Sequence, residues 1–154
     1  MNYEEIRSSL QDLIYRLQDA EKGYEEIRLA SSNKVINKWL DQYAKERHNM
    51  HRELETEMKV LGGNPEVDTT FLGELHRMFI DLKISNTSAD NEFDAIVTEI
   101  ERGASFLIND YTKVLSDVKL PPALVTKLMS QKTHIEAELE SLKDLKEEMT
   151  TEYA

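Results

Sequence analysis

The chain contains no cysteine, so no disulfide can contribute to its stability. A domain of this length, 154 residues, buries roughly 70% of the surface that its unfolded chain exposes, so a hydrophobic core alone can hold it together. A cysteine-free composition suits a reducing compartment, and the N-terminus lacks the basic and then apolar pattern of a signal peptide. We therefore expect a cytoplasmic protein.

Basic residues are also few, with 19 Lys and Arg against 30 Asp and Glu, which gives a formal net charge of −11. A surface of this sign repels the phosphates of nucleic acids and of anionic lipids. No apolar run approaches the length that spans a bilayer. The composition thus argues against nucleic-acid and membrane partners.

Glycine (5) and proline (3) are scarce, so the chain has few turns. Between these turns apolar residues recur in steps of three and four, which is the spacing of one face of an α-helix. The pattern predicts helices at residues 3–30, 34–61, 70–84, 90–118 and 121–149.

The lengths of the connections predict how the four long helices are arranged. The first and last connections are short, which makes antiparallel hairpins, whereas the link over residues 62–88 is long and contains the helix at 70–84. Two hairpins joined by one long crossover are the connectivity of ferritin-like bundles. We therefore expect an all-α, ferritin-like, up-down four-helix bundle that forms a single domain over residues 1–154.

Bundles of this kind can hold two metal ions between inward-facing Glu and Glu-x-x-His side chains. Glu21 lies within the apolar stripe of the first helix, Glu46 at the edge of the second stripe, and Glu101 on the flank of the third. These three residues are the candidate metal ligands. The alternative for Glu21 is an ion pair with the inward-facing Arg47.

The stretch AKERHNMHRELE in the second predicted helix contains two histidines. At 100° per residue, His48 and Glu55 point to solvent and His51 lies on a flank, without a Glu three residues before it. On the last helix, Gln131-x-x-His134 has an amide in place of the acid, and His134 points outward. We expect the first stretch to be mainly a solvated face, with no histidine ligand pair.

Several motifs together resemble one bacterial family, the ferritin-like domain of unknown function 2383. The motifs are Asp19-x-Glu-x-Gly-Tyr24, Leu-Gly-Gly-x-Pro-Glu at 61–66, Gly73-Glu-Leu-His-Arg77, Asp81-Leu-Lys83 and Glu101-Arg-Gly103. The resemblance covers roughly residues 5–145 and implies a ferritin-like four-helix bundle.

One position departs from the pattern of the family. Members usually continue Glu-Arg-Gly with Glu-Asp, whereas this chain has Ala104 and Ser105. Position 104 lies near the centre of the third apolar stripe. If the family binds a metal pair, the resemblance implies that this chain lacks one bridging carboxylate.

Two interpretations of function follow. The first is a non-catalytic bundle without a cofactor, whose di-metal site is degenerate or absent, and which acts through its surface or as a homo-oligomer. A stress-related role for it rests on fold analogy alone. The alternative is an oxidase-like or metal-storing protein that holds a pair of iron or manganese ions through Glu21, Glu46 and Glu101.

Overall fold

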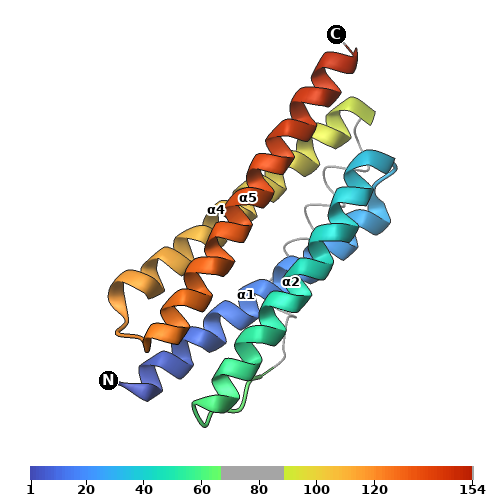
Figure 1. Ribbon diagram of the computed structural model, residues 1–154. Coiled ribbons are helices and arrows are strands. Elements are labelled where there is room, and N and C mark those ends of the chain that lie inside the picture. The colour runs from blue at the N-terminus through green and yellow to red at the C-terminus, as the bar shows by residue number, and fades with distance from the viewer. Residues whose placement is uncertain (67–88, 154) are drawn as a thin grey trace. The chain divides into compact units, whose positions relative to one another are not determined.

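The computed structural model describes residues 1–66 and 89–153, and within them the chain is all-α, as predicted. Four long helices occur in this part of the chain: α1 (Tyr3–Ala30), α2 (Lys34–Val60), α4 (Ala89–Asp117) and α5 (Pro122–Tyr153) (Figure 1). This content is consistent with a four-helix bundle. The predicted helix at 70–84 and the crossover that contains it lie outside the described residues, so the ferritin-like connectivity stays a prediction.

The observed helix boundaries follow the predicted ones closely, with one exception at the C-terminus. The last helix continues to Tyr153, whereas the pattern predicts its end at residue 149. No glycine or proline interrupts the final segment, and residues such as Glu, Lys and Met propagate a helix readily. None of the helices in the described residues is long and apolar enough to cross a membrane.

Asparagine side chains begin the first two helices. The Asn2 side chain accepts a hydrogen bond from the backbone N–H of Glu5 at 3.1 Å. The Asn33 side chain accepts from the N–H groups of Val35 and Ile36, both at 3.0 Å. Such caps satisfy N–H groups that have no partner within the helix. The cap at Asn33 therefore sets where α2 starts after the short break that follows α1.

A glycine ends α2, as the sequence predicts. Gly62 has φ 79°, in the left-handed region that glycine adopts without penalty. Its N–H donates to the Lys59 carbonyl at 3.0 Å, and the N–H of Gly63 donates to the Met58 carbonyl at 2.9 Å. This pair of bonds is the Schellman motif that closes a helix C-terminus.

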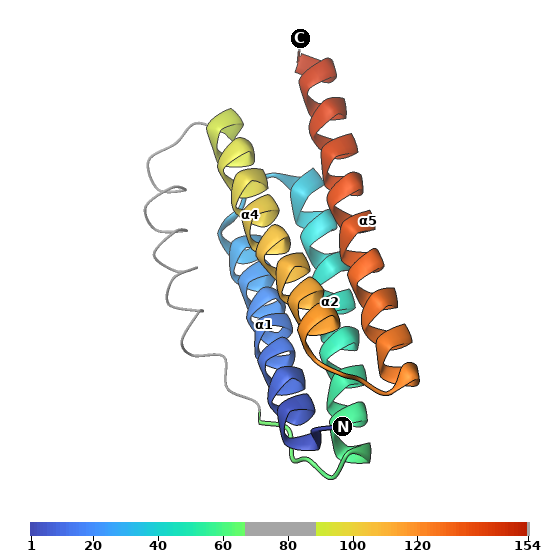
Figure 2. The ribbon, with the colours of Figure 1, turned by 90° about the vertical axis from the view of Figure 1, so that its left-hand side faces the viewer.

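The internal contacts of the chain divide it into two compact units, Met1–Ile96 and Val97–Ala154. The first unit contains the α1–α2 hairpin, whose helices run antiparallel side by side (Figures 1 and 2). Arg7 donates to the Leu61 carbonyl at 3.0 Å near one end, and Arg28 pairs with Asp41 at 3.2 Å near the other. These contacts fix the register of the two helices along their whole length.

Most of the apolar residues on the stripes of the first two helices are buried. Tyr3, the first residue of α1, is 50% exposed. The fully buried apolar side chains of the hairpin include Ile6, Leu10, Ile14, Leu17, Ile36, Leu40 and Leu54.

The second unit contains most of α4 and all of α5. These helices also run antiparallel: the Tyr111 hydroxyl donates to the Gln131 side-chain oxygen at 2.6 Å, and Lys146 lies 4.0 Å from Glu101. The buried apolar side chains of this unit include Ile100, Leu107, Leu124, Leu128, Ile135 and Leu142, all on the predicted stripes. The single domain over residues 1–154 stays a prediction.

Candidate metal centre

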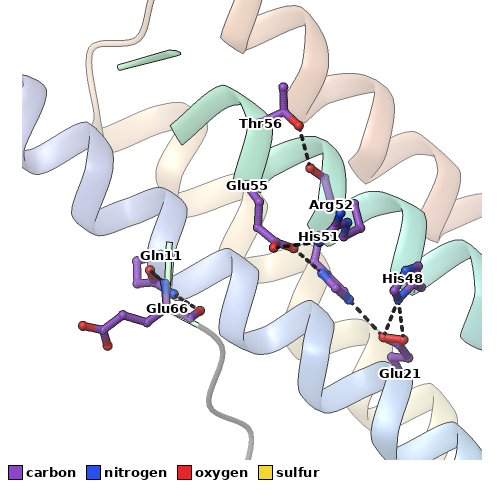
Figure 3. Close-up of polar contacts among 8 residues, drawn as sticks. All are labelled: Gln11, Glu21, His48, His51, Arg52, Glu55, Thr56 and Glu66. Atoms are coloured by element: carbon purple, nitrogen blue, oxygen red, sulfur yellow. Dashed lines mark hydrogen bonds and ion pairs between the residues drawn. The ribbon is translucent and has the colours of Figure 1, made fainter. Parts of the chain in front are cut away.

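Two helices of the hairpin bring one carboxylate and two imidazoles together. His48 and His51 are three residues apart on α2, so they lie on neighbouring positions of one helix face. Glu21 of α1 lies opposite them in the antiparallel register. The three residues belong to the first unit and are drawn in Figure 3.

The polar atoms of these side chains are in direct contact. The Nδ1 atom of His48 lies 3.0 and 3.1 Å from the two carboxylate oxygens of Glu21. The Nε2 atom of His51 lies 2.9 Å from Glu21 Oε1. The side chain of His48 is 53% exposed, that of Glu21 17% and that of His51 7%. The cluster therefore extends from the hairpin interior to solvent.

A second carboxylate contacts the buried imidazole from its other side. Glu55, one helical turn after His51 on α2, places Oε2 2.6 Å from His51 Nδ1. Its other oxygen, Oε1, lies 3.7 Å from the guanidinium of Arg52. Figure 3 shows the His51 ring between the carboxylates of Glu21 and Glu55. Both ring nitrogens of this histidine thus face an acid.

A further acid lies at the exposed side of the cluster. Burial raises the pKa of the Glu25 carboxyl above its ordinary value, and repulsion from Glu21 raises it further. The neighbouring His48 opposes this shift in the pKa of Glu25, and Glu26 adds to it. The position of Glu25 one turn after Glu21 makes the surroundings of the cluster negative, which favours cations.

The cluster fits the requirements of one divalent cation. Three possible ligand atoms, one each from Glu21, His48 and His51, lie within 4.8 Å of one another. Ligand bonds of about 2.0–2.2 Å to nitrogen and oxygen place neighbouring donors roughly 3 Å apart. Glu21 Oε1 lies 2.9 Å from His51 Nε2 and 3.1 Å from His48 Nδ1, so these separations already meet that spacing. Three protein ligands with a position left for water are a recurrent arrangement around zinc.

The three predicted ligands lie in different surroundings. Glu21 is part of the cluster, whereas Glu46 is partly buried elsewhere on α2. Glu101 belongs to the second unit, where its carboxylate lies 4.0 Å from Lys146. A shared site formed by Glu21, Glu46 and Glu101 stays a prediction.

The burial of side chains in the stretch AKERHNMHRELE agrees only in part with the prediction. His48 is exposed, as expected. His51 and Glu55 are each only 6% exposed, so the placement of Glu55 toward solvent was wrong. The physical reason is that the partner helix of a hairpin also buries positions on the flank of the apolar stripe, which the period of a single helix does not show. The signal that could have identified the cluster is His-x-x-His on one helix opposite an inward Glu on its antiparallel neighbour.

Arg47 is fully buried, as its position in the stripe predicts, but it does not pair with Glu21. Its Nη2 atom donates to the Tyr24 hydroxyl at 3.4 Å, and its guanidinium carbon lies 5.5 Å from the centre of the Tyr24 ring. The Glu21 carboxylate contacts the two histidines instead.

The described residues thus define an all-α protein with a carboxylate–histidine cluster on a helical hairpin. A sequence model of the family described as a domain of unknown function (DUF2383) matches residues 5–117. The chain belongs to this family, as its motifs predicted. No curated protein and no solved structure matched the chain. The family description states neither a fold nor an activity, so the ferritin-like fold and the bacterial origin stay predictions.

Proposed function

We propose that the α1–α2 hairpin binds one divalent transition-metal ion through Glu21, His48 and His51. The observation that carries this proposal is the convergence of three ligand atoms, from two helices, within 4.8 Å of one another. In the part of the chain that the structure describes, no other group of three or more His, Cys, Asp or Glu side chains meets this condition.

The chemistry of the donors indicates the class of metal. Imidazole nitrogens favour zinc, iron, copper and nickel, whereas magnesium and calcium favour shells made of oxygen. Two imidazoles and one carboxylate are also a known ligand set for zinc and for ferrous iron. We therefore propose a cation of the zinc and ferrous class, with Zn²⁺ as the first probe.

A single ion replaces the pair of iron or manganese ions that the ferritin-like interpretation offered. One carboxylate and two neutral imidazoles carry one negative charge, which is too little to hold two divalent cations close together. The proposed role is reversible binding, because the half-exposed His48 gives the ion a path to solvent. No reaction is assigned to the site.

The test is zinc binding to the full chain purified without an affinity tag. Competition with a metal-sensitive indicator measures the affinity, and elemental analysis measures the stoichiometry. We expect one Zn²⁺ per chain, with affinity at least tenfold weaker in Glu21→Gln, His48→Ala and His51→Ala. His134→Ala is the matched control, because it removes an exposed histidine of α5 and should leave the affinity unchanged.

Cobalt(II) supplies a second, spectroscopic measurement, since its visible absorption reports the number and type of ligands. Bands of a site with nitrogen ligands should appear in the wild type and in His134→Ala, and should disappear in His51→Ala. A wild-type chain that binds neither ion, or a His51→Ala variant that binds both as tightly as the wild type, would refute the proposal.

A further inference from the structure

The buried imidazole of the cluster has a second acid on the side away from Glu21. The distance from His51 Nδ1 to Glu55 Oε2 is 2.6 Å, and the two side chains are 7% and 8% exposed. Glu55 offers no atom to the candidate site, because its carboxylate faces the opposite nitrogen of the ring. Its contact with His51 therefore calls for an explanation other than ligation.

The two nitrogens of an imidazole cannot both bind a metal in this geometry. The nitrogen that binds must present a lone pair, and in a neutral ring the other nitrogen then carries the hydrogen. An ionised carboxylate only accepts hydrogen bonds, so Glu55 requires the hydrogen to be on Nδ1 of His51. Nε2, which lies 2.9 Å from Glu21 Oε1, is then the nitrogen that binds the cation, and the ion takes the place of any hydrogen that Nε2 donates to Glu21 in the metal-free protein.

Glu55 also fixes the orientation of the ring. It lies four residues after His51 on the same helix, so the backbone of α2 places the two side chains next to each other. The contact of Glu55 Oε1 with Arg52, at 3.7 Å, restrains the other end of the carboxylate. The imidazole is thus held in one rotamer before an ion arrives, which lowers the entropy lost on binding.

We infer that Glu55 is a positioning residue that holds His51 as the Nδ1–H tautomer, with Nε2 directed at the cation. This inference rests on the metal site proposed above and adds a carboxylate that acts through the histidine. Carboxylate–histidine–metal arrangements of this kind typically contribute 10- to 100-fold to metal affinity.

The test compares a substitution that removes the hydrogen-bond acceptor with one that keeps it, while the side chain keeps nearly the same length. Glu55→Met keeps the length but has no acceptor oxygen, and we expect it to weaken Zn²⁺ binding about 10- to 100-fold. Glu55→Gln keeps one acceptor oxygen for Nδ1–H, so it should recover part of that loss. Glu57→Met and Glu57→Gln are the matched controls, because Glu57 lies two residues further along α2 on a different face of the helix.

The second measurement is the tautomer itself, which a merely structural role would not determine. Long-range proton–nitrogen correlation spectra of the ¹⁵N-labelled, zinc-loaded wild type should show His51 protonated at Nδ1 and bound to zinc through Nε2. Glu55→Gln should keep this tautomer, and Glu55→Met should show a mixture or the other tautomer. Circular dichroism establishes that each variant is folded.

The outcomes distinguish this inference from the proposed function. Binding of zinc to His51 through Nδ1 in the wild type overturns the inference without any variant. Unchanged affinity in Glu55→Met, together with loss of binding in His51→Ala, overturns the inference alone. A wild type that does not bind zinc overturns both.

Discussion

The Glu21 carboxylate joins α1 to α2, so replacing it tests the cluster in the absence of metal. In Glu21→Gln the charge is lost and one acceptor oxygen remains. The contact with buried His51, at 2.9 Å, is a hydrogen bond to a charged group, which typically contributes about 1.5–3 kcal/mol. The contacts with half-exposed His48 are screened by solvent and contribute about 0–1 kcal/mol.

The remaining acceptor oxygen of Gln keeps a neutral hydrogen bond of about 0.5–1.5 kcal/mol, so we expect the free energy of unfolding to fall by about 1–2.5 kcal/mol. For a chain of this length, that corresponds to a decrease in Tm of about 2–10 °C. Asp12→Asn is the matched control, since it removes an exposed carboxylate from the same helix and should change the free energy by less than about 0.5 kcal/mol.

The assay is urea unfolding followed by circular dichroism, with a chelator present so that bound metal does not contribute. Adding zinc at about a hundredfold excess over its Kd should stabilise the wild type by about 2.7 kcal/mol, and Glu21→Gln by much less. If Glu21→Gln unfolds at the same urea concentration as the wild type and Asp12→Asn, then the carboxylate–imidazole contacts do not hold the two helices together.

Four further predictions concern single positions elsewhere in the described chain. Gly62→Ala should lower stability by about 1–2 kcal/mol, because φ is 79° there; a Tm equal to that of the wild type would contradict it. Glu92→Ala should lower the free energy of unfolding by about 1.5–3 kcal/mol, because the Glu92 carboxylate accepts hydrogen bonds from the N–H and the hydroxyl of Ser32 at 2.8 and 3.0 Å. Ser32→Ala removes only the hydroxyl bond, so it should lower the free energy of unfolding less in the same melting experiment. Burial, and then repulsion from neighbouring acids, raises the pKa of Glu25 above 4.5 in the folded state, so stability is lost as the pH rises from 4.5 through the raised pKa. Glu25→Gln should therefore stabilise the metal-free protein at pH 7 but not at pH 4. Equal effects at the two pH values would refute this. Ala104→Glu should destabilise the protein by more than about 2 kcal/mol, because residue 104 is only 4% exposed, and a neutral effect on urea unfolding would show that the new carboxylate reaches solvent.

The start and the end of α2 follow from local chemistry, and this chemistry can be read from the sequence. Asn33 caps α2 because a side-chain oxygen at that position reaches N–H groups two and three residues later. Gly62 ends α2 because the left-handed conformation costs glycine nothing. The position of Arg47 on the apolar stripe likewise predicted its burial, because the helical period places each residue on a definite face.

The candidate site depended on information that no single helix contains. His51 is on the flank of its stripe and Glu55 is still further from the centre of that stripe, yet both are buried, because the helical period alone does not determine where a neighbouring helix covers them. Only the antiparallel register of α1 and α2 brings Glu21 to His48 and His51. The amino-acid sequence by itself thus determined the helices and the buried stripes. The tertiary structure decided which acid meets which histidine, because that depends on the packing of residues about 30 positions apart in the chain.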